Sequence, residues 1–174
     1  MSAAQGSYRR DPQSAVVTLS TGEQRTYRCD PLGHRVIVGN ERGATLFAFG
    51  ERGAQVGAFE SPLDVALVTP TFDGDEALRP EDAWLAVADY GNARVQIFDL
   101  DGVLVDVLDG DELDYGWRPC RLSWRSPFLQ IDGVEGGGCR VHLAAALLAH
   151  CADRALPKAG PTVLRRRPNE AELH

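Results

Sequence analysis

Alternation of apolar and polar residues is clearest in the middle of the chain, where two strands and two turns fit into one short window. An apolar run ends at Asp89, and alternation resumes over residues 94–98. Between the two runs, Gly91-Asn92 are residue types that tolerate a positive φ, and Asp101-Gly102 after the second run is typical of a tight hairpin turn. The window therefore predicts a meander of short antiparallel strands.

The same pattern occurs earlier in the chain at a constant offset of 49 positions, without a gap, so the window is a repeat. Arg42-Gly43 stands in the first copy where Gly91-Asn92 stands in the second. The matched apolar and glycine positions are Val38, Leu46, Phe49, Gly53 and Phe59 in the first copy and Val87, Val95, Phe98, Gly102 and Leu108 in the second.

This repeat resembles the NHL repeat, the unit of a β-propeller blade. The resemblance implies four short strands in each unit, with a first unit over residues 26–59 and a second over 61–108. In the first unit, strands are expected at 26–29, 34–38, 45–49 and 54–59. The second unit opens with Pro62, and Asp64 stands where glycine is usual in the family. A less tight turn is expected there.

A third, degenerate unit is predicted over residues 117–143, where Pro119 echoes Pro62. A further strand at 15–19 is expected to serve as the outer strand of another blade. The predicted fold class is therefore all-β, a partial β-propeller of NHL-type four-stranded antiparallel blades with a C-terminal helix, in which the blades span residues 14–143. A flexible segment is expected over residues 1–13.

Beyond Leu143 the apolar residues recur with helical spacing. They predict one helix from about residue 141, assigned over 144–156 as a cap on an open sheet edge; a partner-binding helix is the alternative. The residues that carry this spacing are Leu143, Ala144, Leu147, Leu148, Cys151 and Ala155. Residues 157–174 are predicted to be a polar tail, in which Arg165-Arg166-Arg167 is only a weak localisation or nucleic-acid signal.

The length of the chain limits how many blades it holds. A blade takes roughly 40–45 residues and a closed ring needs about 4–8 blades, whereas the chain has 174 residues. Three outcomes follow: an open partial propeller, a ring completed by self-association, or a segment of a longer parent. An open ring leaves a sheet edge with unpaired backbone groups, and such an edge favours association.

Composition and charge exclude several function classes. The formal net charge of −7 disfavours general attraction to nucleic acid or to an anionic membrane. The first residues lack the basic-then-apolar pattern of a secretory signal, and no apolar run approaches the ~20 residues of a membrane span. The chain is therefore expected to be soluble and cytoplasmic.

Residues that could carry catalysis or bind a metal or cofactor are scattered, so none is assigned. The cysteines lack the paired spacing of a zinc site, and the histidines are dispersed. Gly133 opens a glycine-rich stretch, but Glu135 stands where a phosphate-binding loop needs its second glycine. The acidic residues around 99–114 lack the ligand order of an EF-hand and are interpreted as a charged blade rim, with docking of a basic partner as the alternative.

The long insertion at residues 69–82 is the best sequence candidate for a contact site, because loops of this length are commonly functional or disordered. Together with the acidic rim it gives eight candidate partner-binding residues: Phe72, Asp73, Asp75, Leu78, Arg79, Tyr90, Asp99 and Asp101. The predicted function is a non-catalytic protein–protein interaction module that binds a protein or peptide. The alternative is a degenerate relative of metal-dependent propeller enzymes of the peptidyl-hydroxyglycine lyase or lactonase and esterase type, which the resemblance also implies.

Overall fold

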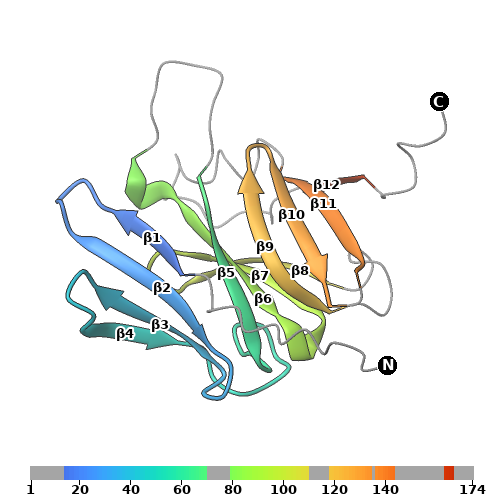
Figure 1. Cartoon of the computed structure of the whole chain (residues 1–174), viewed down its shortest axis with the longest axis horizontal. Helices are drawn as coiled ribbons and strands as arrows, with labels where there is room; N and C mark the ends of the chain where they lie inside the picture. Colours follow the sequence, from blue (N-terminus) through green and yellow to red (C-terminus); the bar gives the residue numbers. More distant parts are fainter. Residues whose placement is uncertain (1–13, 70–78, 110–117, 135, 144–162, 167–174) are drawn as a thin grey trace, which may run out of the picture.

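Three antiparallel sheets make up the fold of this chain. A computed structural model describes residues 14–69, 79–109, 118–134, 136–143 and 163–166. Apart from two short 3-10 helices, η1 (Pro80–Asp82) and η2 (Tyr90–Asn92), the regular structure of these residues is β-strand. Each sheet has four strands that follow one another as a meander (Figure 1). The expectation of an all-β chain with four-stranded antiparallel sheets is confirmed at this level.

The sheets are named here by their order in the chain. The first sheet contains β1 (Ala15–Thr18), β2 (Gln24–Asp30), β3 (Arg35–Asn40) and β4 (Thr45–Phe49). The second sheet contains β5 (Pro62–Val68), β6 (Trp84–Asp89), β7 (Arg94–Asp99) and β8 (Leu104–Leu108). The third sheet contains β9 (Pro119–Arg125), β10 (Phe128–Gly133), β11 (Gly138–Leu143) and β12 (Val163–Arg166).

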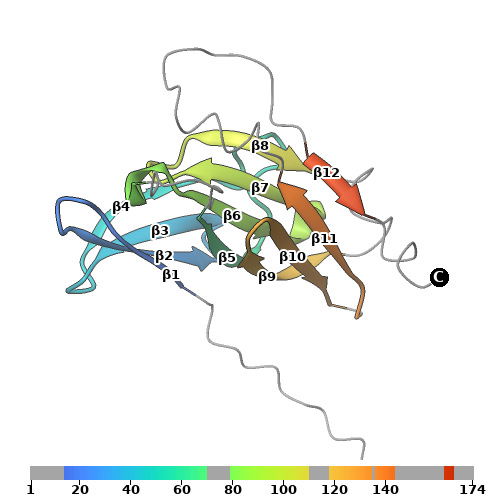
Figure 2. The same cartoon turned by 90° about the horizontal axis from the view of Figure 1, so that it is seen from above.

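The second sheet lies between the other two (Figure 1). Strand β5 contacts β1 and β2 on one side and β9 on the other. Figure 2 shows the first strands β1, β5 and β9 along one side of the stack and the last strands β4, β8 and β12 along the opposite side. The stack therefore has two end faces, one on the first sheet and one on the third.

Burial of the second sheet on both faces explains its unusually apolar sequence. Side chains of a strand alternate between the two faces of its sheet. Leu85 and Val87 pack against the first sheet, whereas Ala86 and Ala88 pack against the third. All six residues of β6 are buried as a result, and a strand buried on both faces is a continuous apolar run rather than an alternating one.

The two copies of the sequence repeat meet in the core between the first and second sheets. Phe49 and Phe98 occupy equivalent positions of the repeat, and their ring centroids are 5.0 Å apart. Phe59 completes an aromatic cluster, 5.6 Å from Phe98 and 6.4 Å from Phe49. The equivalent residues Val38 and Val87 belong to the same buried cluster. The repeated hairpins β3–β4 and β6–β7 thus pack through equivalent faces.

The repeat is displaced by one strand relative to the sheets, which corrects two predictions. The hairpin β3–β4 supplies the third and fourth strands of its sheet, whereas β6–β7 supplies the second and third. Residues 54–59, predicted as a strand, form a loop whose only ladder contact is the isolated bridge between Arg52 and Phe59. The strand predicted at 15–19 does not belong to another blade, because β1 pairs with β2 and completes the first sheet.

The third sheet follows the predicted unit and then departs from it. Its strands β9, β10 and β11 coincide with the predicted apolar runs, but residues 141–143, predicted to begin a helix, end β11. The helix predicted over 144–156 lies outside the described residues. Residues 163–166 fall in the predicted polar tail, yet they form β12 and pair with β11, with Arg140 opposite Arg166. No helix among the described residues is long and apolar enough to cross a membrane.

The turn between β6 and β7 differs in detail from its prediction. The positive φ falls on Ala93, at 52°, rather than on Gly91 or Asn92. Gly91 is instead required by close approach, because its N–H donates to the Glu60 carbonyl at 2.7 Å. A Cβ atom on Gly91 would overlap that backbone oxygen. Gly102, in contrast, has the positive φ that the hairpin turn predicted.

Replacing Gly91 by alanine is expected to destabilise the chain by about 1–3 kcal/mol, because the added methyl group displaces backbone at a packed contact. Gly39→Ala is the matched control, since a Cβ atom there meets Ala44 at an ordinary 3.4 Å. Urea unfolding of both variants measures the difference. Equal unfolding midpoints for the two variants would contradict this role of Gly91.

Candidate functional site

A buried polar cluster lies between the second sheet and the loop that links it to the first. Asp89 and Gln96 are fully buried and Arg94 is 7% exposed. Asp89 and Arg94 are direct cross-strand partners on β6 and β7, and Arg94 Nε lies 2.7 Å from Asp89 Oδ2. Asn92 Nδ2 donates to the same oxygen at 2.9 Å. This ion pair and its hydrogen bonds compensate the cost of burying two charges.

The rest of this cluster binds backbone of the loop at residues 53–60. The Arg94 guanidinium donates to the carbonyls of Ala54, Gln55 and Ala58 at 2.8–2.9 Å. Gln96 Nε2 donates to the Ala58 carbonyl at 2.7 Å, while Gln96 Oε1 accepts the N–H of Gly57 at 2.8 Å. The cluster therefore anchors a loop that lacks a strand partner. Its role is structural.

The sequence also indicates this cluster, through a feature other than the alternation of apolar and polar residues. Arg94 and Gln96 are polar residues on one face of a strand whose other positions are buried and mostly apolar. A buried polar group requires a partner, so their spacing indicates a specific acceptor on the facing element. The first repeat has Thr45 and Phe47 at the equivalent positions.

Four of the eight predicted contact residues, Phe72, Asp73, Asp75 and Leu78, lie outside the described residues. Arg79 precedes η1, where its guanidinium forms an ion pair with Asp82 at 3.2 Å. The ring of Tyr90 faces Arg118, whose guanidinium carbon lies 5.4 Å from the ring centroid. Among the described candidates, Arg79 precedes β6 and Tyr90 follows its other end, so these two do not share a site. The role of all eight residues in partner binding stays a prediction.

Asp99 and Asp101, the two residues of the predicted rim that are among the contact candidates, make contacts within the fold. Asp99 Oδ1 accepts the N–H groups of Asp101 and Val103, both at 2.9 Å, which stabilises the hairpin turn before β8. Asp101 forms an ion pair with Arg25 of the first sheet at 3.0 Å. The Asp101 side chain is 62% exposed, so this pair contributes little to stability and leaves the carboxylate accessible.

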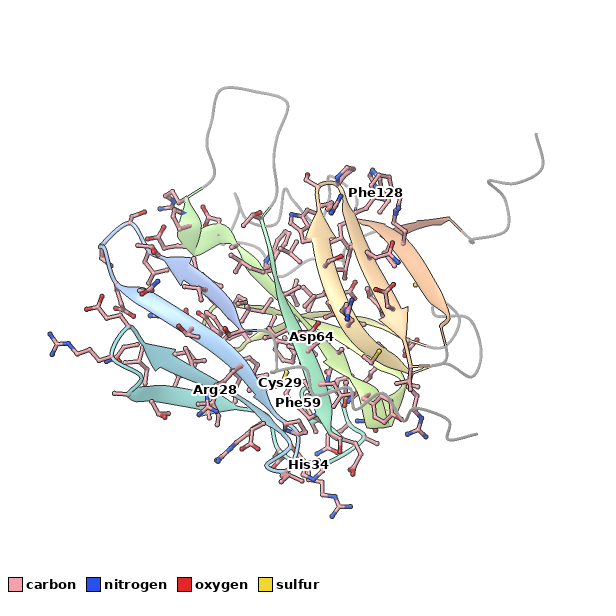
Figure 3. The ribbon with its side chains drawn as sticks, viewed as in Figure 1. Arg28, Cys29, His34, Phe59, Asp64 and Phe128 are labelled. Carbon is pink, nitrogen blue, oxygen red and sulfur yellow. The ribbon has the colours of Figure 1, made fainter. Side chains whose placement is uncertain are left out.

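Asp64 links the second and third sheets through its carboxylate. It is buried, and its Oδ2 accepts the backbone N–H of Leu122 on β9 at 2.7 Å. The register of β5 and β6 shifts between Pro62 and Asp64. Cys29 of β2 lies near Asp64 in the middle of the stack (Figure 3). Burial raises the pKa of the Cys29 thiol, and the charges of Asp64 and Asp89 raise it further, so this cysteine stays protonated and unreactive.

The end face of the first sheet carries both apolar and polar side chains: Val16, Ile37, Leu46 and Ala48 alternate with its buried positions, and so do Thr18, Gln24, Thr26, Arg28, Asp30 and Arg35. Side chains that alternate with its buried positions point away from the second sheet. Val16 and Leu46 are 46% and 45% exposed on this face, and Ile37 of β3 is half-buried. Thr26 of β2 lies opposite Val16 in the ladder, between Val16 and β3. Arg28, opposite Ile37 in the ladder, is exposed. No other described sheet covers these residues.

The end face of the third sheet is polar. Positions that alternate with its buried core residues carry Arg121, Ser123, Arg125, Phe128, Gln130, Asp132, Arg140 and His142. Figure 3 shows Arg28 and Phe128 on the two outer sheets, on opposite sides of the second sheet. The end face of the first sheet therefore carries Val16, Ile37 and Leu46 among polar residues, whereas the end face of the third sheet is polar apart from Phe128.

Among the described residues, no group of three or more His, Cys, Asp or Glu side chains is close enough together to hold a metal ion. No protein-family model matches the chain. No curated protein matches it either.

Proposed function

We propose that this chain is a non-catalytic protein-interaction module built from NHL-type propeller blades. Two features support the blade interpretation: three consecutive four-stranded meanders, and first strands that approach one another along one side of the stack. The proline positions Pro62 and Pro119 open β5 and β9 in the same way. The hairpin β3–β4, displaced by one strand, is where the chain departs from a regular series of blades.

The single observation that carries the proposal is that three larger apolar side chains, Val16, Ile37 and Leu46, lie on the end face of the first sheet, which no other described sheet covers. In a stack of sheets each inner face is buried against a neighbour, as both faces of the second sheet are. Val16, Ile37 and Leu46 would be buried in the same way by a further sheet or by another protein. Exposed apolar side chains with polar residues around them are typical of interaction surfaces.

Replacing Leu46 by aspartate tests this function, because it places a charge on the proposed surface without changing the buried core. Leu32→Asp is the matched control, since Leu32 lies in a turn and is 93% exposed. Each protein is immobilised, and the bound proteins are identified by quantitative mass spectrometry. A defined set of proteins that binds the wild-type chain and the Leu32 variant, but not the Leu46 variant, is the expected result. Identical sets for all three proteins would refute the proposal.

A second copy of the chain is one candidate for the partner, through self-association that completes a ring. Light scattering after size exclusion, over a range of concentrations, detects it. A dimer that Leu46→Asp dissociates and Leu32→Asp preserves would identify the second copy as the occupant of the face. A monomer would assign the face to a different protein.

A further inference from the structure

We propose that the end face of the third sheet binds an acidic peptide segment through Arg121, Arg125 and Arg140. This inference rests on the proposed function as an interaction module and names the partner chemistry of one of its faces. Three arginines stand on this face against one aspartate, Asp132, in a chain whose formal net charge is −7. The charge of the face is therefore opposite to that of the chain as a whole.

The face is not built to receive a further sheet. The alignment of Pro62 with Pro119 makes Ala66 and Val68 of the second sheet equivalent to Ser123 and Arg125 of the third. Ala66 and Val68 are buried against the third sheet, whereas Ser123 and Arg125 are exposed. The positions that bury apolar side chains in one sheet thus carry polar side chains in the next.

The arginines of this face lack carboxylate partners within the described part of the chain. None of the ion pairs there involves Arg121, Arg125 or Arg140. Arg140 is held in place by uncharged groups: its Nε donates to Gln130 Oε1 at 3.4 Å, and its guanidinium carbon lies 5.6 Å from the Phe128 ring centroid. A guanidinium fixed in this way can form two parallel hydrogen bonds with a carboxylate.

The register gives the spacing of these charges. Arg125 lies opposite Phe128, and Arg140 lies opposite Gln130, two residues further along β10. Arg125 and Arg140 are two strand spacings apart across the sheet and two residues apart along it, a separation of about 12 Å. Arg121 lies at about the same distance from Arg140, in the opposite direction along the strands. Carboxylates four residues apart in an extended peptide point to the same face and lie about 13 Å apart, because successive side chains alternate between the two faces. An extended segment with this acidic spacing matches two of the three arginines at a time, since the three form a triangle rather than a line.

The surroundings of Phe128 favour an acidic peptide over single-stranded nucleic acid. Nucleic-acid bases would require a free aromatic ring for stacking, but the Phe128 ring contacts His142 edge-on at 5.1 Å and lies beneath Arg140. The net negative charge of the chain also repels a long polyanion more strongly than a short peptide.

Fluorescence anisotropy with a labelled peptide of about ten residues tests the proposal. The probe carries glutamate at every fourth position in a glycine–serine background, and its glutamine counterpart is the control peptide. The double variant Arg125→Gln with Arg140→Gln is expected to bind at least about tenfold more weakly than the wild-type chain, with binding that weakens as salt is raised. Arg42→Gln, a substitution in an exposed turn of the first sheet, is expected to bind as the wild-type chain does.

Three results would overturn the proposal: equal affinity of the double variant and the Arg42 variant, equal affinity for the glutamine peptide, or tighter binding of a single-stranded oligonucleotide than of the acidic peptide. Thermal unfolding of each variant confirms that the fold is retained. The Leu46-dependent binding of proteins is measured on the same preparations. Loss of acidic-peptide binding alone would overturn only this inference, whereas loss of the Leu46-dependent set would overturn the proposed function.

Discussion

Replacing Arg94 by methionine is expected to destabilise the folded chain by about 3–5 kcal/mol, because the substitution leaves a buried carboxylate without its charge partner. Asp89 is fully buried and receives hydrogen bonds from Arg94 Nε, Asn92 Nδ2 and the Glu60 N–H. The carbonyls of Ala54 and Gln55 lose their Arg94 donors at the same time. The free energy of unfolding from urea titrations measures the effect.

The exposed Arg42 supplies the matched control for this substitution. Arg42→Met changes the same side chain in a turn of the equivalent hairpin, and we expect it to alter stability by no more than about 0.5 kcal/mol. Adding Asp89→Asn to Arg94→Met removes the uncompensated charge, so the double variant is expected to be more stable than Arg94→Met alone. If the Arg94 and Arg42 variants unfold at the same urea concentration, the ion pair does not have the structural task assigned to it.

The sequence predicted the second sheet well because its signals are local. The alternation and turn residues from Asp89 to Gly102 lie within one hairpin and the turn that follows it, and the strands β6 and β7 occur where those signals place them. Hairpin turns are set by the conformational preferences of a few adjacent residues. Gly102 has the predicted positive φ for that reason.

The segment at residues 54–59 was predicted wrongly because its partners are distant in the sequence. Its apolar residues and glycines resemble a strand, but its carbonyls are bound by Arg94 and Gln96, about forty positions later. Periodicity records which residues are apolar and not where the backbone hydrogen bonds go. The same limit explains why β1 was assigned to another blade, since a local pattern does not state which sheet edge a strand joins.

The same distinction between local patterns and contacts distant in the sequence applies to the candidate sites. The acidic residues around 99–114 were interpreted as a charged blade rim, yet Asp99 binds its own turn and Asp101 pairs with Arg25 of another sheet. The arginine face depends on the register of β9, β10 and β11, which gathers residues from 121 to 142 on one side of a sheet. The sequence alone shows which residues are charged. Which charged residues share one face of a sheet follows only from the strand pairing.

Replacing Phe59 by alanine is the second substitution with a large expected effect, about 3–5 kcal/mol of lost stability. Phe59 is fully buried, and its ring contacts Phe49 and Phe98 at the junction of the two repeated hairpins. Removing the ring leaves a cavity whose walls include backbone fixed in the sheets, so collapse around it is limited. Val56→Ala is the matched control in the same loop, because Val56 is 63% exposed, and a change within about 0.5 kcal/mol is expected there.

The effect of Phe59→Ala is also expected to depend on Arg94. Arg94 binds the Ala58 carbonyl, one residue before Phe59, so ring and guanidinium hold the same loop and their substitutions should not add. In the double variant with Arg94→Met, the loop has already lost its polar contacts, and the further loss caused by Phe59→Ala should be smaller than in the wild-type background. Urea unfolding of the two single variants and the double variant gives the coupling energy. If the losses of unfolding free energy are strictly additive, the aromatic cluster packs independently of the polar cluster. The loop is then held by two independent sets of contacts.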